Sequence, residues 1–317
     1  MGWKINSKDK LLIFILVGAL ICGLSITFYG ANNPLTEVEY IRTDTGEQIT
    51  ISTTDKVDSV STEQNDEVEV EPVTYYTYNE EYTNELIAYQ AINKDVIGTI
   101  KIAGTNLNHP IVQTIGDEGY YLRKDLNHRT NSHGVPFLDE DNHLEGEGEN
   151  LILFGHAITL PKPDSFGELQ RYESVNYYKA HPYIETTSAS GTRKWVVIAA
   201  FLADTKEDFE YSEYDIFDNQ FDFQDWYDEV QKRNWLNVEI PAQYGDTFMS
   251  LSTCAYESTS ETARMCVVAK LLDSTSDYSL AIENALQSEN PLMPKALSWY
   301  KVSRSRWVQK YIDGYTE

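Results

Sequence analysis

The sequence has few basic residues for its length. Its 317 residues include 25 Lys and Arg against 50 Asp and Glu, which gives a formal net charge of −25. Nucleic-acid binding requires a basic surface that contacts phosphates. Electrostatic docking on an anionic membrane likewise requires a polybasic patch. The charge balance therefore argues against nucleic acid as a partner and against membrane binding through such a patch.

Cysteine is also scarce, with three residues in the whole chain, Cys22, Cys254 and Cys266. This number is too small for a disulfide-stabilised scaffold, and the spacing is not that of a zinc site. Hydrophobic residues make up 41% of the chain and aromatic residues 12%. That composition allows a packed core and excludes global disorder.

Long hydrophobic runs are absent except for one, residues 11–29, which contain no charge over 19 positions. As a helix this run would be about 28 Å long, close to the thickness of the hydrocarbon core of a bilayer. Lys4, Lys8 and Lys10 precede it, so the positive-inside rule places residues 1–10 in the cytoplasm and the rest of the chain outside. We predict a transmembrane signal-anchor. A cleaved signal peptide is the alternative, but the run is long for one and lacks a small-residue cleavage site.

Two segments flank the predicted folded domain, which covers residues 75–272. Residues 32–74 contain eleven acidic and two basic residues and little apolar periodicity, which predicts an acidic flexible linker with room for short strands. Residues 273–317 form a C-terminal extension that we expect to be helical. Its residues 296–311 could form a basic amphipathic helix that packs on the domain, or one that contacts the outer membrane face or the wall.

Short runs rich in β-branched and aromatic residues dominate the predicted domain. A helix is predicted over residues 80–93, and two more over 165–179 and 220–232. Few helices and many strands favour a mixed β-barrel or sandwich over alternating βαβ units. The predicted strands cover residues 96–102, 110–112, 134–138, 151–154, 183–187, 195–201, 236–240, 247–253 and 265–272.

Three reactive side chains follow or open predicted strands. Cys254 follows the strand 247–253, and Arg264 opens the next strand after a nine-residue loop. If these strands pair antiparallel, Cys254 and Arg264 lie side by side at one rim. His156 comes just after the strand 151–154. A rigid β scaffold commonly supports a site on such loops.

These residue types suit acyl transfer through a thioester. A nearby cation favours the thiolate form of Cys254, which is the nucleophilic form. The imidazole of His156 can protonate a leaving amine and deprotonate an incoming one. The guanidinium of Arg264 can hold a developing oxyanion. On residue type and spacing alone, a buried structural thiol remains the alternative for Cys254.

The motifs around these residues resemble those of sortases. LSTCAYE, followed by SETARMCVVAKLL, is similar to the Leu-(Ser/Thr)-Thr-Cys signature with its downstream arginine, and ENLILFGHAI resembles the strand that ends in Gly-His. NKDVIGTIKIAGTNLNHPIVQ, YYLRKDLN, HGVPFLDED and FGELQRYES are further matches in the right order. Together they cover most of residues 93–272. The segment between the strands 195–201 and 236–240 resembles the helical insert of class B sortases.

The resemblance implies a mainly β fold, a closed barrel of about eight strands with a few helices, one of them in the insert. It implies that Cys254 is the nucleophile, His156 the general acid/base and Arg264 the oxyanion or substrate clamp. It implies no metal and no organic cofactor. The residues that match peptide-groove positions are Leu122, Ser252, Thr205 and Phe209. Glu118 departs from the family, because class B relatives often carry Asn there.

The implied reaction cleaves a C-terminal sorting motif of surface proteins and transfers the acyl group to an amine of a peptidoglycan precursor. Polymerisation of pilins is an alternative within the family, although the sequence shows no obvious lid over the site. A catalytically silent peptide-binding surface domain and a peptidase that passes the acyl group to water are also possible functions. A regulatory disulfide could join Cys254 and Cys266. A metal could bind among His128, His133, Asp139, Glu140, Asp141 and His143.

Overall fold

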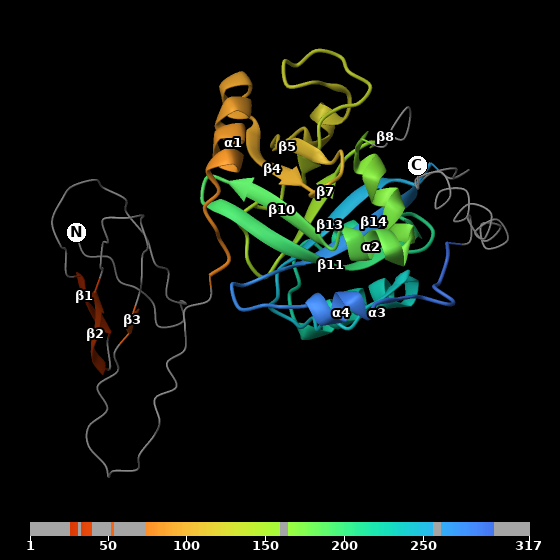
Figure 1. Ribbon diagram of the computed structural model, residues 1–317. Coiled ribbons are helices and arrows are strands. Elements are labelled where there is room, and N and C mark those ends of the chain that lie inside the picture. The colour runs from red at the N-terminus through yellow and green to blue at the C-terminus, as the bar shows by residue number, and fades with distance from the viewer. Residues whose placement is uncertain are drawn as a thin grey trace, which may run out of the picture. The chain divides into compact units, whose positions relative to one another are not determined.

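The chain forms two compact units in this computed structural model, Met1–Val70 and Glu71–Glu317 (Figure 1). The structure describes residues 26–30, 33–39 and 52–53 of the first unit, and residues 74–158, 164–255 and 261–294 of the second. In the first unit, β1 (Ile26–Gly30) pairs antiparallel with β2 (Asn33–Glu39), and β2 pairs with β3 (Ser52–Thr53).

The predicted membrane span lies mostly outside the described residues. Its residues 26–29 belong to strand β1, which corrects the helical prediction for those four positions. Within the part of the chain that the structure describes, no helix is both long enough and apolar enough to span a bilayer. Strands β2 and β3 fall in the segment predicted as a linker, where the sequence left room for short strands.

The second unit is built around a closed barrel, as the resemblance implied. Its strand order is β10-β11-β14-β13-β7-β6-β5-β4. Neighbours pair antiparallel except for β5 with β6 and β7 with β13, which are parallel. The strands are β4 (Val96–Lys101), β5 (Asn108–Val112), β6 (Phe137–Leu138), β7 (Asn150–Phe154), β10 (Tyr183–Ser188), β11 (Gly191–Asp204), β13 (Phe248–Cys254) and β14 (Ala263–Leu271).

One predicted strand does not join the barrel. The run 236–240 forms only the two-residue strand β12 (Leu236–Asn237), which pairs with β15 (Leu286–Gln287) of the C-terminal extension. The alternation of this run is that of a strand, but its pairing partner lies outside the barrel. The extension also contains the short helix α4 (Ser279–Glu283), and the predicted helix 296–311 lies outside the described residues.

The predicted helices are present, with one difference in type. Helix α1 (Glu80–Ile92) begins at Asn79, whose side chain accepts a hydrogen bond from the Tyr82 amide, and it packs along β4 and β10 (Figure 1). The stretch predicted over 165–179 forms a 3₁₀ helix, η2 (Phe166–Glu173), followed by α2 (Val175–Ala180). Two more 3₁₀ helices are η1 (Glu118–Arg123) and η3 (Tyr211–Glu213).

Helix α3 (Gln220–Arg233) of the insert packs on the barrel through aromatic side chains. Trp226 is fully buried, and its ring lies 5.1 Å from that of Phe217 and 5.1 Å from that of Phe248 on β13. Phe223 stacks on Phe248 at 5.7 Å. The insert is therefore held by the strand that ends at Cys254.

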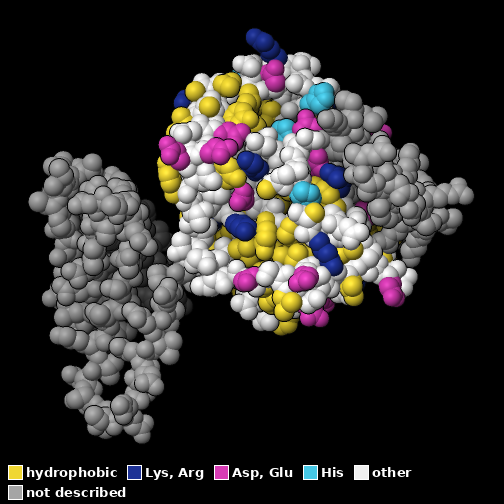
Figure 2. Space-filling view, in the orientation of Figure 1, with side chains coloured by type: hydrophobic (Ala, Val, Ile, Leu, Met, Phe, Trp, Pro, Cys, Tyr) yellow, Lys and Arg dark blue, Asp and Glu magenta, His cyan; other side chains and the backbone are white. Residues whose placement is uncertain are grey.

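Charged side chains are dispersed over the visible face of the second unit. Lysine and arginine are scattered singly there, between acidic and apolar side chains, and form no continuous stripe among the described residues (Figure 2). The prediction that nucleic acid is not a partner rests on the net charge of the sequence and stays a prediction.

A partly buried carboxyl group lies at the start of η1. Burial, followed by repulsion from and hydrogen bonding to Asp139, raises the pKa of Glu118 to about 7. The carboxyl group therefore binds its proton more tightly in the folded protein than in the unfolded chain.

Replacing Trp226 with Ala should lower the free energy of unfolding by about 3–5 kcal/mol, because it leaves a cavity between α3 and β13. Phe221 lies on the same helix but is 80% exposed, so Phe221→Ala should change the free energy of unfolding by less than about 0.5 kcal/mol. Urea denaturation monitored by circular dichroism measures both values. Equal losses for the two variants would contradict the packing described.

Glu118→Gln should be more stable relative to the wild type at pH 8 than at pH 5. As pH rises from 4.5 towards 7, the unfolded chain loses the Glu118 proton before the folded protein does, so stability falls in this window. Glutamine cannot ionise, so the variant does not lose this stability as pH rises. Thermal unfolding of variant and wild type from pH 5 to pH 8 checks this. A difference in Tm between variant and wild type that stays the same from pH 5 to pH 8 would contradict the raised pKa of Glu118.

Candidate active site

The register of β13 and β14 brings Cys254 and Arg264 together. The two residues are paired positions of the antiparallel ladder, at the end of one strand and the start of the other. The amide of Ala255 donates to the Ala263 carbonyl at 3.0 Å, which makes Cys254 and Arg264 a non-hydrogen-bonded pair. In such pairs the facing side chains are closest, with Cα atoms about 4.5 Å apart. The antiparallel arrangement expected from the sequence is confirmed.

The neighbouring strand β7 places His156 at the same end of the barrel. β7 runs parallel to β13, and Phe154 is the register partner of Ser252. His156 lies two residues beyond Phe154, as Cys254 lies two residues beyond Ser252. The Gly155 amide donates to the Ser252 carbonyl at 3.1 Å, and its own carbonyl accepts from the Thr253 hydroxyl at 2.7 Å. The thiol, imidazole and guanidinium therefore lie at three adjacent strand ends.

Gly155 gives the chain the room it needs to place His156. A Cβ at this position would lie 2.8 Å from the ring of Phe166, the first residue of η2. After His156 the chain forms β8 (Ala157–Ile158), which pairs with β9 (Asp164–Ser165) just before η2. The 3₁₀ helix thus packs against the backbone that carries the histidine.

The imidazole of His156 is oriented by a backbone contact. Its Nε2 lies 2.7 Å from the carbonyl oxygen of Leu122 in η1. A carbonyl oxygen only accepts, so Nε2 is the nitrogen that donates a hydrogen in this contact. In the neutral ring, Nδ1 then keeps a free lone pair that can take a proton.

The guanidinium of Arg264 is half-buried and held by main-chain oxygens. Its NH1 group donates to the Glu261 carbonyl at 2.8 Å and to the Ala263 carbonyl at 3.1 Å. Because arginine stays protonated, these contacts fix a permanent positive charge at the rim.

Cys254 has the exposure that a nucleophile requires. Its side chain is exposed and free, whereas Cys266 is free but buried. Burial raises the pKa of the Cys266 thiol well above its ordinary value, and a hydrogen bond with Ser250 only partly offsets this. Neither residue is in a disulfide, so the structure gives no support to a regulatory bond between them.

A buried amide that sequence reasoning missed holds the backbone of Cys254. Gln170 of η2 is 8% exposed, and its Nε2 donates to the Cys254 carbonyl at 3.0 Å. This carbonyl points away from β14, on the side where β7 has already ended. The string FGELQRY carries Gln170, but nothing in its spacing indicated this contact.

The four predicted groove residues have different environments. Leu122 is 40% exposed beside the His156 contact, and Ser252 is buried with its hydroxyl 2.8 Å from that of Tyr211. Thr205 is half-buried, and its hydroxyl donates to the Thr262 carbonyl at 3.2 Å. Phe209 is 6% exposed and packs among core aromatic rings. Leu122 is thus exposed beside the strand ends, whereas the buried side chains of Ser252 and Phe209 offer little surface to a peptide. Substrate contacts of all four stay predictions.

The structure offers no support for the alternative metal site. In the described residues no group of three or more His, Cys, Asp or Glu side chains could hold a metal ion. His128 instead lies 3.2 Å from the Tyr120 hydroxyl, and His133 lies 3.3 Å from the Asn131 side chain.

Known proteins share this fold and these sequence motifs. The family model described as "Sortase domain" matches residues 100–272. Sortase B of Staphylococcus aureus is 31% identical over 183 residues, which are 58% of this chain and 72% of the relative. The solved S. aureus sortase B–substrate complex is 30% identical, with a TM-score of 0.53 over 61% of this chain and 86% of that one. A sortase B complexed with triglycine is 30% identical, with a TM-score of 0.52 over 61% and 87%.

The family match covers more than half of the chain, and the residues it covers contain His156, Cys254 and Arg264. The barrel and the helical insert of this chain are those expected of class B members. The chain therefore belongs to the sortase family of cysteine transpeptidases and is a class B sortase.

Proposed function

We propose that this sortase cleaves a C-terminal sorting motif of surface proteins and joins the new carboxyl end to an amine of the cell wall. Cys254 is the nucleophile, His156 the general acid and base, and Arg264 the clamp for the substrate oxygen. The observation that carries this assignment is the placement of these side chains at the ends of β13, β7 and β14.

The first half-reaction forms a thioester. The Cys254 sulfur attacks the carbonyl carbon of the scissile peptide bond, and the carbonyl oxygen gains negative charge opposite the Arg264 guanidinium. Nδ1 of His156 takes the proton of the Cys254 thiol as the sulfur attacks, and gives that proton to the leaving nitrogen as the peptide bond breaks. The exposed position of Cys254 leaves its sulfur open to an extended peptide.

The second half-reaction reverses these roles. An acceptor amine attacks the thioester carbon, His156 takes its proton, and the Cys254 thiolate leaves. The similar structures described as a substrate complex and a complex with triglycine support a peptide donor and a peptide amine acceptor. The residues that contact either peptide in this chain are proposed to include Leu122, whose side chain is exposed beside the strand ends.

The proposed place of the reaction is the outer surface of the membrane. Residues 11–25 of the apolar run, which lie outside the described residues, would anchor the chain with its N-terminus in the cytoplasm, and the acidic segment 32–74 would hold the barrel away from the bilayer. This arrangement would place the catalytic barrel beside exported proteins and wall precursors.

Cys254→Ala should lower peptide cleavage by at least about 1,000-fold, because it removes the atom that forms the thioester. The assay uses a library of quenched peptides with Thr before the scissile bond, together with triglycine as acceptor. Mass spectrometry should find a wild-type acyl-enzyme on Cys254 and a ligated product. Cys266→Ala is the matched control and should keep activity within about threefold. Wild-type turnover by Cys254→Ala would rule out the mechanism.

Deleting residues 11–29 should move the protein from the membrane fraction to the soluble fraction of the producing cell. The wild-type chain should stay with the membrane after extraction with high salt, because its anchor is apolar and salt screens only charge contacts. Immunoblotting of the two fractions measures this. Release of the wild-type chain by salt alone would contradict an inserted anchor.

A further inference from the structure

Asp204 is a buried carboxylate beside the strand end that carries Arg264. It is the last residue of β11 and pairs with Ala263, while Ala203 pairs with Arg264. β14 lies between β11 and β13, so Arg264 has Ala203 on one side and Cys254 on the other. Asp204 is 1% exposed, and a carboxylate buried to this extent needs several hydrogen-bond donors.

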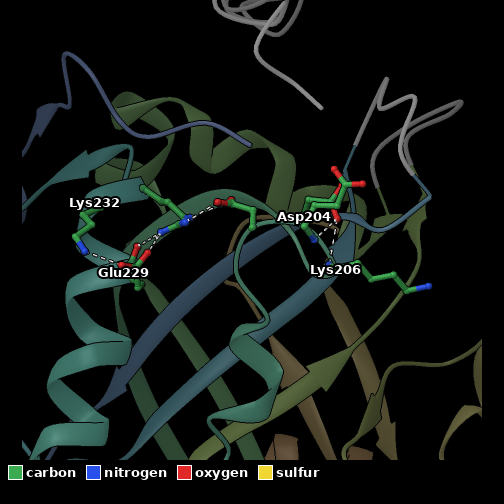
Figure 3. A network of polar contacts seen from close by, with 7 residues as sticks. Asp204, Lys206, Glu229 and Lys232 are labelled. Atoms are coloured by element: carbon green, nitrogen blue, oxygen red, sulfur yellow. Dashed lines mark hydrogen bonds and ion pairs between the residues drawn. The ribbon is translucent and has the colours of Figure 1, made fainter. Parts of the chain in front are cut away.

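Among the described residues, two separate backbone segments donate hydrogen bonds to the Asp204 carboxylate. Its Oδ1 accepts the Thr262 hydroxyl at 2.7 Å and the amides of Lys206 at 3.1 Å and Glu207 at 3.3 Å. The ammonium group of Lys206 points away from the carboxylate (Figure 3), so that residue contributes only its backbone. One carboxylate thus joins the start of the insert to the residues that precede β14.

The Thr262 segment in turn holds the guanidinium. The carbonyls of Glu261 and Ala263, on either side of Thr262, accept the NH1 group of Arg264. The Thr262 carbonyl accepts the amide of Thr205 at 3.1 Å. A rotation of residues 261–263 would therefore move both acceptor carbonyls and release the guanidinium from its place.

Ion pairs of the insert support Asp204 from the other side. The Asp208 amide donates to the Asp204 carbonyl at 2.9 Å, and the Asp208 carboxylate accepts Arg233 NH2 at 2.7 Å. Arg233 also bonds Glu229, which Lys232 contacts at 2.6 Å (Figure 3). Burial alone would lower the pKa of Arg233, but Asp208 and Glu229 raise it overall, so the guanidinium stays charged. The loop 204–208 is thus tied to α3.

We propose that Asp204 and Thr262 are positioning residues for Arg264, an inference that rests on the clamp function proposed above for that arginine. The Asp204 carboxylate orients residues 261–263 through Thr262, and their carbonyls hold the guanidinium at the rim opposite Cys254. Neither positioning residue contacts the substrate. The insert, through its link to Asp204, acts as the support of the arginine.

Thr262→Val tests this link, because valine keeps the shape of threonine and removes the donor to Asp204. In the full chain, kcat/KM for the peptide that the wild type cleaves fastest should fall about tenfold, equivalent to about 1.4 kcal/mol of transition-state stabilisation. The loss should lie chiefly in kcat, since the guanidinium acts on charge that develops during reaction. Thr262→Ser restores the hydroxyl and should recover activity to within about twofold.

Two further variants separate positioning from a general effect on folding. Thr275 makes the same kind of contact with Asp273, at 2.6 Å, beyond the opposite end of β14, so Thr275→Val should leave kcat unchanged. In an Arg264→Ala background, Thr262→Val should cause no further loss, because the group it positions is absent. Asp204→Asn should lower kcat in the same direction as Thr262→Val.

The outcomes distinguish this inference from the proposed function. If Arg264→Ala keeps the activity of the wild type, both the proposed function and this inference are wrong. The same holds if the wild type cleaves no peptide in the library. An impaired Arg264→Ala enzyme with a fully active Thr262→Val would overturn the inference alone. The inference alone is also overturned if Thr262→Val lowers kcat by the same factor in the wild type and in the Arg264→Ala background. The Thr262 variants decide the matter even if Asp204→Asn does not fold.

Discussion

The active site depends on the hydrogen-bond register of β13 with its two neighbours. β13 pairs parallel with β7 and antiparallel with β14, so the end of β13 meets one strand end and one strand start. Because side chains alternate along a strand, a slip of one residue on either side would turn Cys254 or Arg264 to the other face. The chemistry proposed for this sortase therefore follows from main-chain pairing as much as from side-chain identity.

Polar contacts around this rim keep the strand ends in place where the ladders stop. Gln170 holds the Cys254 carbonyl, Thr253 holds the Gly155 carbonyl, and Leu122 holds the His156 ring. The first two contacts use main-chain carbonyls that the sheet leaves without a partner at its edge. A buried polar group without such a contact would cost about 1–3 kcal/mol, which is a strong constraint on the loops that surround the site.

Much of the fold could be predicted from local sequence because the barrel strands are runs of β-branched and aromatic residues between turn residues. Cys254 and Arg264 were predictable as neighbours, since a short loop joins two strands that must then run antiparallel. The position of His156 beside Cys254 depends on the parallel pairing of β7 with β13. No local pattern reveals this pairing, so the prediction for His156 rested on the family resemblance. The contact of Gln170 was missed because polar residues in 3₁₀ helices and loops carry no periodic signal. The strand predicted over 236–240 is only two residues long and lies outside the barrel, because its partner β15 comes from the C-terminal extension.

The most direct test of the register is a disulfide at the paired positions. Facing residues of a non-hydrogen-bonded pair lie close enough for an S–S bond, so Arg264→Cys should cross-link to Cys254 under mild oxidation. Peptide mapping by mass spectrometry should find residues 254 and 264 linked, with Cys266 still a free thiol. A thiol at 264 that stays unlinked to Cys254, or that links to Cys266, would contradict the strand pairing on which the active site depends.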